Sequence, residues 1–513
     1  MSRGGKKRRA ILLGIDGVTF DLLLPWTRNG IMPNLGRAME MGSYGDLGST
    51  LPPTTPPAWT SCVTGSGPGK HGIFDFRESY LLDPYRQPVS SVSVKAPKIW
   101  QLLNAAGRKT GVMNVPVTYP PERVDGFMIS GMMTPSQECD YTFPSGLKHE
   151  IHSACGDYLI EIDIPRYNVE RLDDSLLFFR DITNCFKKRK EVFFHLMDQK
   201  EWDFFMVVFT MTDRIQHLFW KYLFPGSELH DQQHAPLIRE EIFKCYSLVD
   251  DMLGEVLSGL DGGTDLFLVS DHGFGYTEKW FNVDRWLEDT GVLKEWPEAE
   301  VMFSGIPTQG LNIINNNTIN NNTGGPWAEN EFKRYDQLRD RLTEELMNLK
   351  DPGSGRELID RVLYRDEVFE GPFSGLAPDI LFVAKDYSVL GRNNPGSQEW
   401  LETSEDQANG FHRSNGIFLA VGPHIRKNNP ILDADITDVM PTILFTMGEP
   451  QPAGLDGRLL EDIFERDFLD TVPAGPEIID LQRPVQAGDR ISVYSREEAR
   501  TVSERLVGLG YIE

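Results

Sequence analysis

The chain has 513 residues, of which 40% are hydrophobic and 25% charged, so it has the composition of a globular protein with a large core. Its 76 acidic residues exceed its 51 basic residues by 25, which argues against a dedicated nucleic-acid-binding protein. Five scattered cysteines without a C-x-x-C pair exclude a disulfide scaffold and indicate reduced thiols.

The N-terminal segment carries a basic cluster at residues 6–9 and then a short apolar run at residues 11–15. A secretory signal needs about 7–15 apolar residues, and Asp16 ends this run too early. No stretch approaches the roughly 20 apolar residues of a membrane span. We therefore expect a cytoplasmic protein with no membrane span and no nucleic-acid partner.

Short apolar runs with the length of buried strands alternate with helical patterns along the chain. The runs lie at residues 11–15, 204–211, 266–270, 380–384 and 416–421. The helical patterns lie at residues 97–106, 176–199 and 239–260. This alternation predicts an α/β fold around a mostly parallel central sheet.

Three segments depart from this pattern. Residues 77–158 are irregular and rich in turns, so we predict an insertion that caps the site. The Asn-rich tract at 315–323 is of low complexity and predicts a loop. Residues 471–513 form a C-terminal tail whose helical stretch, 495–509, is expected to pack on the body. The catalytic domain is then expected to span residues 1–470.

Carboxylates stand at the ends of three predicted strands. Asp16 follows the first run, Asp213 the second, and Asp271 the third. Ligands of parallel α/β sheets gather at the carboxyl ends of the strands. Each aspartate alone could be a helix N-cap, so the prediction of a site depends on the three occurring together.

Three histidines accompany these carboxylates. His217 lies four residues after Asp213, on the same helix face. His272 follows Asp271 directly, and His412 lies in a turn-like segment before a strand. Aspartate and histidine side chains are ligands of zinc and manganese. Three of each would supply two metal ions with three protein ligands apiece.

Hydroxyl side chains stand between Asp16 and the other candidates, in the proline-rich segment 51–65. The prolines favour extended backbone until a helical pattern begins at about Pro57, which places Thr54 and Thr55 near a helix N-terminus. Such a terminus favours an anion such as phosphate. N-capping by Thr55 is the simpler interpretation, and it is compatible with catalysis.

In their order along the chain, these motifs resemble the alkaline phosphatase superfamily. The resemblance is closest to the type I phosphodiesterase/nucleotide pyrophosphatase branch and extends to about residue 460. The segments that carry it are Ile15-Asp16-Gly17, Pro53-Thr54-Thr55-Pro56, Val63-Thr64-Gly65, His71-Gly72-Ile73, Asp213 with His217, Ser270-Asp271-His272-Gly273, Gly410 to His412, Ile436 to Thr442 and Gly454 to Arg458.

The resemblance implies a three-layer α/β/α sandwich and a role for each candidate residue. One metal ion would be held by Asp213, His217 and His412. The other would be held by Asp16, Asp271, His272 and the hydroxyl of Thr55. Alignment of the Thr-Gly and His-Gly-Ile landmarks puts the nucleophile on Thr55, with Thr54 as the alternative.

The resemblance further implies a metal-dependent hydrolase of phosphodiester or pyrophosphate bonds that works through a phosphothreonine intermediate. Two divalent ions are expected, zinc in the first place and manganese as the alternative. The expected substrate is a small phosphate ester or nucleotide-like molecule. A phosphomutase or phosphotransferase and a phosphomonoesterase remain alternatives. A sulfatase is disfavoured because Cys62 does not stand in a C-x-P-x-R motif. A non-catalytic metal-binding protein is the last alternative.

Overall fold

The computed structural model describes residues 8–79, 86–162, 164–223, 233–305, 309–320, 323–325, 327, 331–394, 396–403, 410–470 and 493–512. Within this part, a ten-stranded sheet has the strand order β19-β2-β18-β7-β1-β6-β3-β4-β5, with β20 beside β2. Strands β7, β1, β6, β3 and β4 are parallel, whereas β18 runs antiparallel to β7 and β2. The strands are β1 (Arg9–Ile15), β2 (Ser43–Gly48), β3 (Thr110–Val115), β4 (Gly126–Ser130), β5 (Thr142–Phe143), β6 (Phe204–Phe209), β7 (Thr264–Val269), β18 (Asn415–Val421), β19 (Asn429–Pro430) and β20 (Ala434–Asp435).

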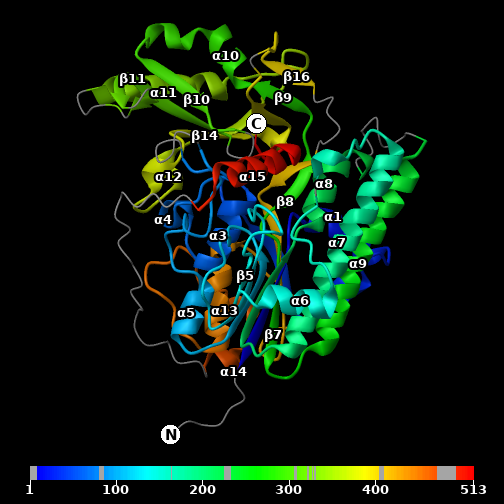
Figure 1. Cartoon of the computed structure of the whole chain (residues 1–513). Helices are drawn as coiled ribbons and strands as arrows, with labels where there is room; N and C mark the ends of the chain where they lie inside the picture. The colour runs from blue at the N-terminus through cyan, green and yellow to red at the C-terminus, as the bar shows by residue number, and fades with distance from the viewer. Residues whose placement is uncertain are drawn as a thin grey trace.

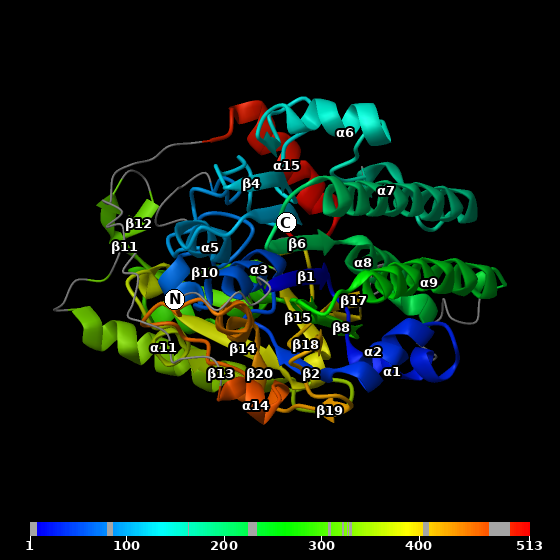
Figure 2. The same cartoon turned by 90° about the horizontal axis from the view of Figure 1, so that it is seen from below.

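Helices cover both faces of this sheet, which confirms the three-layer α/β/α sandwich (Figures 1 and 2). Alternate residues of β1 point to opposite faces, so Leu13 packs in one apolar core and Leu12 in the other. The first face carries α1 (Phe20–Arg28), α2 (Pro33–Met41), α6 (Leu147–Cys155), α7 (Leu172–Gln199), α8 (Met211–Leu223), α9 (Ala235–Gly259) and α15 (Arg496–Gly508). The second carries α3 (Thr55–Thr64), with α4 (Pro68–His71) after it, α5 (Ile99–Ala105), α13 (Val439–Met447) and α14 (Arg466–Leu469).

All five apolar runs form strands, and the three helical patterns form α5, α7 and α9. Two details differ from the expected parallel sheet. The run at 416–421 is β18, which is antiparallel, and the run at 380–384 is β14 (Ile380–Ala384), which lies in a separate sheet. A short apolar run indicates burial, but it does not determine strand direction or partner.

A small lobe with its own apolar core lies above the carboxyl edge of the central sheet, at the top of Figure 1. It is an excursion of the chain between β8 (Gly273–Tyr276) and β17 (Gly410–Arg413), which pair with each other. Its elements are β9 (Lys279–Asn282), α10 (Val283–Thr290), β10 (Ala299–Phe303), β11 (Gly310–Asn320), β12 (Thr323–Gly325), α11 (Phe332–Met347), β13 (Ile359–Tyr364), α12 (Arg365–Val368), β14, β15 (Val389–Arg392) and β16 (Leu401–Thr403).

The structure differs from the prediction for two segments, since both contribute to strands. The segment 77–158, predicted as a cap, contains β3, β4 and β5 of the central sheet. The Asn-rich tract, predicted as a loop, lies in β11 as far as Asn320, because Asn315 continues the antiparallel pairing of β11 with β10. Residues 321–322 lie outside the described part. The division of the chain near residue 470 stays a prediction, and residues 471–492 are likewise not described.

The C-terminal helix α15 packs on the body, as predicted. Ser495 caps it through a hydrogen bond to the Glu498 amide. The Tyr494 hydroxyl donates to the carbonyls of Val89 and Met133, both at 3.1 Å. All five cysteines are free thiols. Among the helices of the described segments, none is long and apolar enough to cross a bilayer.

The packing of α15 predicts a selective loss of stability. Leu506 is 1% exposed in the first core, whereas its neighbour Val507 is 49% exposed. Leu506→Ala removes buried methyl groups and should lower the free energy of unfolding by about 2–5 kcal/mol. Val507→Ala is the matched control and should change it by less than about 0.5 kcal/mol. Urea denaturation measures both, and equal effects would contradict this packing.

Candidate functional site

The carboxyl edge of the central sheet gathers the three predicted aspartates. β7, β1 and β6 are adjacent and parallel, and the last residues of the three strands lie side by side at one edge of the sheet. Asp16 follows β1 directly, Asp213 lies in the first turn of α8 after β6, and Asp271 follows β7 after one residue. All three side chains are fully buried. The sheet therefore holds three carboxylates together away from water.

Helix α8 adds the first histidine. Asp213 and His217 are four residues apart on this helix and face the same side. The Nε2 atom of His217 lies 3.4 Å from the Oδ1 atom of Asp213. The predicted pair is therefore formed.

The short ladder between β8 and β17 brings in His412. His412 pairs with Phe274 across the two strands, and its ring stacks on that of His272 with the centroids 3.6 Å apart. The Nε2 atoms of His412 and His217 are 3.0 Å apart. Gly410 is needed at the start of β17, because a Cβ there would lie 2.1 Å from the carbonyl oxygen of Gln216 in α8.

Thr55 is the first residue of α3, two residues earlier than the sequence predicts. Two prolines follow it in the first helical turn, where a helix needs no N–H donor. The Thr55 hydroxyl lies 3.2 Å from Nε2 of His272. The neighbouring Thr54 hydroxyl is buried and has no hydrogen-bond partner among the described residues. The predicted nucleophile therefore lies at the aspartate–histidine cluster.

Two histidines are fixed in the tautomer that binds metal ions. The Nδ1 atom of His272 lies 3.1 Å from the carbonyl oxygen of Gly273, and Nδ1 of His412 lies 2.9 Å from that of Pro53. A carbonyl oxygen only accepts hydrogen bonds, so each Nδ1 carries the proton. Each Nε2 atom consequently presents a lone pair to the cluster.

The donor atoms of the cluster fit divalent metal ions. Within the described segments, Oδ1 of Asp16, Oδ1 of Asp213 and Oδ2 of Asp271 are buried and lack any hydrogen-bond partner. A buried carboxylate oxygen without a partner is costly, and a bound cation removes that cost. The Nε2 atoms of His217 and His412, 3.0 Å apart, face the same cluster.

Two overlapping groups of side chains could hold a metal ion. Their ligand atoms lie within 4.8 Å of one another in Asp213, His217 and His412, and again in Asp16, Asp213 and His272. The first group is the predicted set, and the second shares two members with the other predicted set. The remaining predicted members are close: Oδ2 of Asp271 is 3.4 Å and the Thr55 hydroxyl 3.2 Å from Nε2 of His272. The assignment of ligands to individual ions stays a prediction.

The electrostatics of the cluster also favour cations. Burial, and then the charge of Asp213, raise the pKa of Asp16 well above its usual value. Burial, and then Asp16, do the same to the pKa of Asp271. Burial and the nearby His412 lower the pKa of His272, which keeps that ring neutral. Bound cations would reverse the carboxyl shifts, because they favour ionised carboxylates.

Asp213 behaves differently because it has cationic and hydrogen-bonding neighbours. Burial opposes its ionisation, but His217 and Arg214 hold its pKa well below the usual range. Arg214 and Tyr511 both donate hydrogen bonds to its Oδ2 atom, which leaves Oδ1 directed at the histidines. Arg214 is fully buried and also pairs with Glu161 at 3.1 Å. Asp213 is thus held as an ionised carboxylate in a fixed orientation.

Trp59 and Tyr511 hold two of the aspartates in place, and the sequence pattern did not identify either of them. The indole N–H of Trp59 donates to Oδ2 of Asp16 at 3.1 Å, and the spacing of four residues from Thr55 in α3 is a signal of this role. Gly14 makes room for that ring, since a Cβ would lie 2.4 Å from Cη2 of Trp59. Tyr511 comes from the C-terminal segment, and nothing in the local sequence pattern indicates that it reaches the site.

A hollow of about 50 Å³ opens beside the two histidines of the first group. Its surface is mostly apolar and aromatic, so it suits an apolar or planar part of a ligand next to the cluster. Its lining includes Pro53, Tyr387, Leu390, Phe411 and Tyr511, besides His217 and His412.

Comparisons with known proteins agree with this geometry. The family described as type I phosphodiesterase / nucleotide pyrophosphatase matches residues 10–415. Human ectonucleotide pyrophosphatase / phosphodiesterase 5 is similar in structure, with 16% identity and a TM-score of 0.50, over 89% of this chain and 100% of that chain. Murine ectonucleotide pyrophosphatase / phosphodiesterase 5, in an inactive form with threonine replaced by alanine and in complex with AMP, is similar with 16% identity and a TM-score of 0.51, over 89% of this chain and 100% of that chain. At this identity the likeness shows the fold alone, and a comparison with curated proteins finds no match.

The contact between Tyr511 and Asp213 makes a prediction for metal affinity. Tyr511→Phe removes one of the two donors that orient Asp213, so metal affinity should fall about 10–100-fold. Tyr494→Phe is the matched control, since it removes a hydroxyl from the same segment away from the cluster. Competition with a chelator measures both affinities. Equal affinities in the two variants would show that Tyr511 does not support the site.

Proposed function

The chain belongs to the type I phosphodiesterase / nucleotide pyrophosphatase family of hydrolases, and on that premise we propose a specific reaction. The protein hydrolyses phosphodiester or pyrophosphate bonds of small, nucleotide-like substrates through a phosphothreonine formed on Thr55. One observation carries the proposal: the Thr55 hydroxyl, at the start of α3, lies 3.2 Å from Nε2 of His272 within the cluster of unpartnered carboxylate oxygens.

We propose two divalent ions at this cluster, zinc in the first place and manganese as the alternative. Asp213, His217 and His412 would hold one ion, and Asp16, Asp271, His272 and Thr55 the other. Such ions lower the pKa of a bound hydroxyl and stabilise charge on phosphoryl oxygens.

The chain's own residues contribute position, orientation and exclusion of water. Thr55 is fully buried at the N-terminal end of α3, where the helix dipole favours a negatively charged oxygen. The Thr55 hydroxyl loses its proton as Oγ1 forms a bond to phosphorus, and the bond from phosphorus to the leaving oxygen, which takes up a proton, breaks. Water later cleaves the phosphothreonine, which transfers the phosphoryl group to water and restores the hydroxyl. Trp59 and Tyr511 hold the carboxylates of Asp16 and Asp213 in position throughout.

The choice of a nucleotide-like substrate is supported by the murine relative described in complex with AMP, and by the apolar hollow beside His217 and His412, which suits a planar group. The inactive threonine-to-alanine form of that relative supports a threonine nucleophile. A sulfatase reaction is disfavoured because Cys62 does not stand in a C-x-P-x-R motif, from which a formylglycine nucleophile would be made. Localisation in the cytoplasm stays a prediction from the sequence.

Replacement of Thr55 tests the proposal. Thr55→Ala removes the attacking oxygen, so kcat for bis(p-nitrophenyl) phosphate should fall roughly 10³-fold or more. Thr55→Ser keeps a hydroxyl and should retain part of the activity. Thr54→Ala is the matched control, because it removes the adjacent buried hydroxyl, and it should remain active. Full activity of Thr55→Ala, or loss of activity only in Thr54→Ala, would overturn the assignment.

A further inference from the structure

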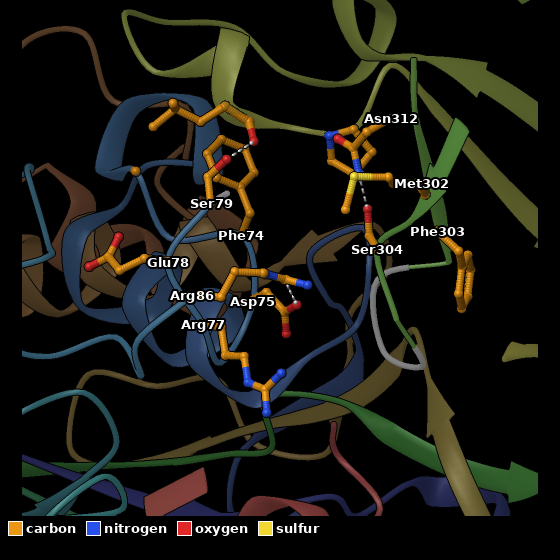
Figure 3. A pocket seen from close by; sticks show the side chains of 13 residues that line it. Phe74, Asp75, Arg77, Glu78, Ser79, Arg86, Met302, Phe303, Ser304 and Asn312 are labelled. Carbon is orange, nitrogen blue, oxygen red and sulfur yellow. Dashed lines mark hydrogen bonds and ion pairs between the residues drawn. The ribbon is translucent and has the colours of Figure 1, made fainter. Parts of the chain in front are cut away.

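A second cavity, of about 170 Å³, lies close to the cluster, between the segment after α4, the small lobe and the C-terminus. A buried water needs roughly 10–15 Å³ of such space, so the cavity has room for a phosphate or carboxylate group. An adjoining hollow of about 40 Å³ shares five lining residues with this cavity. Figure 3 shows the side chains around that hollow. The residues that line the larger cavity include Asp75, Arg77, Arg86, Ser304, Tyr511 and Ile512.

The charges that line this cavity do not cancel. Asp75 and Arg86 form an ion pair of 3.1 Å, in which the Asp75 side chain is only 8% exposed. Arg77 extends from the same chain segment and adds a second guanidinium group (Figure 3). Among the described residues that line this cavity, two cations therefore face one anion.

The two guanidinium groups line one cavity and repel each other. Burial, and then the charge of Arg86, lower the pKa of Arg77. The Nε atom of Arg86 is buried and has no hydrogen-bond partner within the described part of the chain. A bound oxyanion would relieve the repulsion and accept hydrogen bonds in the geometry that guanidinium groups offer to phosphate and carboxylate.

Tyr511 connects this cavity to the candidate active site. Its side chain lines the arginine cavity and also the hollow beside His217 and His412. Its ring stacks on Phe76 with the centroids 4.5 Å apart, and its hydroxyl donates to Asp213. Tyr511 therefore lies between the arginine cavity and the hollow at the cluster, so the two places are about one side chain apart.

We infer that Arg77 and Arg86 form an anion-binding subsite for the substrate of the proposed reaction. The subsite binds a second anionic group, a phosphate or a carboxylate, that the substrate carries several bonds away from the scissile phosphorus. This inference rests on the proposed function and narrows its substrate class to phosphodiesters with an additional anionic end.

Three matched substrates test this subsite: p-nitrophenyl propyl phosphate and its analogues with a phosphate or a carboxylate at the end of the propyl chain. Wild-type protein should prefer at least one charged analogue, by roughly 10–100-fold in kcat/KM, as expected for hydrogen bonds to a charged group. Arg77→Gln should reduce that ratio to near one. The identity of the preferred analogue distinguishes phosphate from carboxylate recognition.

Arg361→Gln is the matched control, because it removes an exposed arginine of the small lobe outside the cavity, and it should keep the wild-type ratio. A wild-type ratio near one, or an unchanged ratio in both Arg77→Gln and Arg86→Gln, would overturn the subsite. A preference that appears only in Glu513→Gln would also overturn it, because the arginines would then bind the residue that follows Ile512.

Failure of the proposed function gives a different result. Wild-type protein would then hydrolyse none of the three compounds. In that case binding of the same compounds is measured by calorimetry, and the ratio of Kd values replaces the ratio of kcat/KM values. The same preference in Kd, lost in Arg77→Gln, supports the subsite, and equal Kd values overturn it.

Discussion

The burial of three carboxylates at one edge of a sheet is the constraint on which the rest of this structure depends. Asp16, Asp213 and Asp271 are each fully buried, and each keeps one oxygen without a hydrogen-bond partner among the described residues. Such an arrangement requires either protonation, which the raised pKa values of Asp16 and Asp271 favour, or compensating positive charge. Arg214 supplies part of it, and the fixed lone pairs of the histidines are placed to bind the cations that would supply the rest.

The chain connections that build the cluster also determine what surrounds it. The small lobe leaves the body directly after β8 and returns at β17, so one two-stranded ladder both places His412 against His272 and anchors the lobe above the site. The C-terminal segment closes another side, where Tyr511 orients Asp213 and separates the cluster from the arginine cavity. The surroundings of the cluster therefore come from parts of the chain that are far from its residues in sequence.

The sequence pattern was sufficient to predict an α/β fold with a carboxylate and histidine site, and the family resemblance added the three-layer arrangement and the choice of Thr55. Apolar runs that end in polar residues, and an i,i+4 pair, are local signals, and parallel strands bring such residues together. Partner and direction of a strand are long-range properties, which explains why β14 belongs to another sheet and β18 is antiparallel. The capping role expected of segment 77–158 depended on the same long-range information, because its strands look irregular until they are paired.

Residues that support the site through tertiary contacts were not predictable in the same way. Trp59 shares a helix face with Thr55, which is a local signal. The positions of Tyr511 and Arg77 near the site result only from packing between segments that are distant in sequence. The measurement that tests the cluster most directly is anomalous diffraction at the zinc and manganese absorption edges from crystals of the full chain. We expect two peaks in wild-type protein, both within ligand distance of Asp213 or its neighbours His217, His272 and His412, and their loss in Asp213→Asn. Wild-type crystals grown with either metal that show no peak at these residues would contradict the two-metal site.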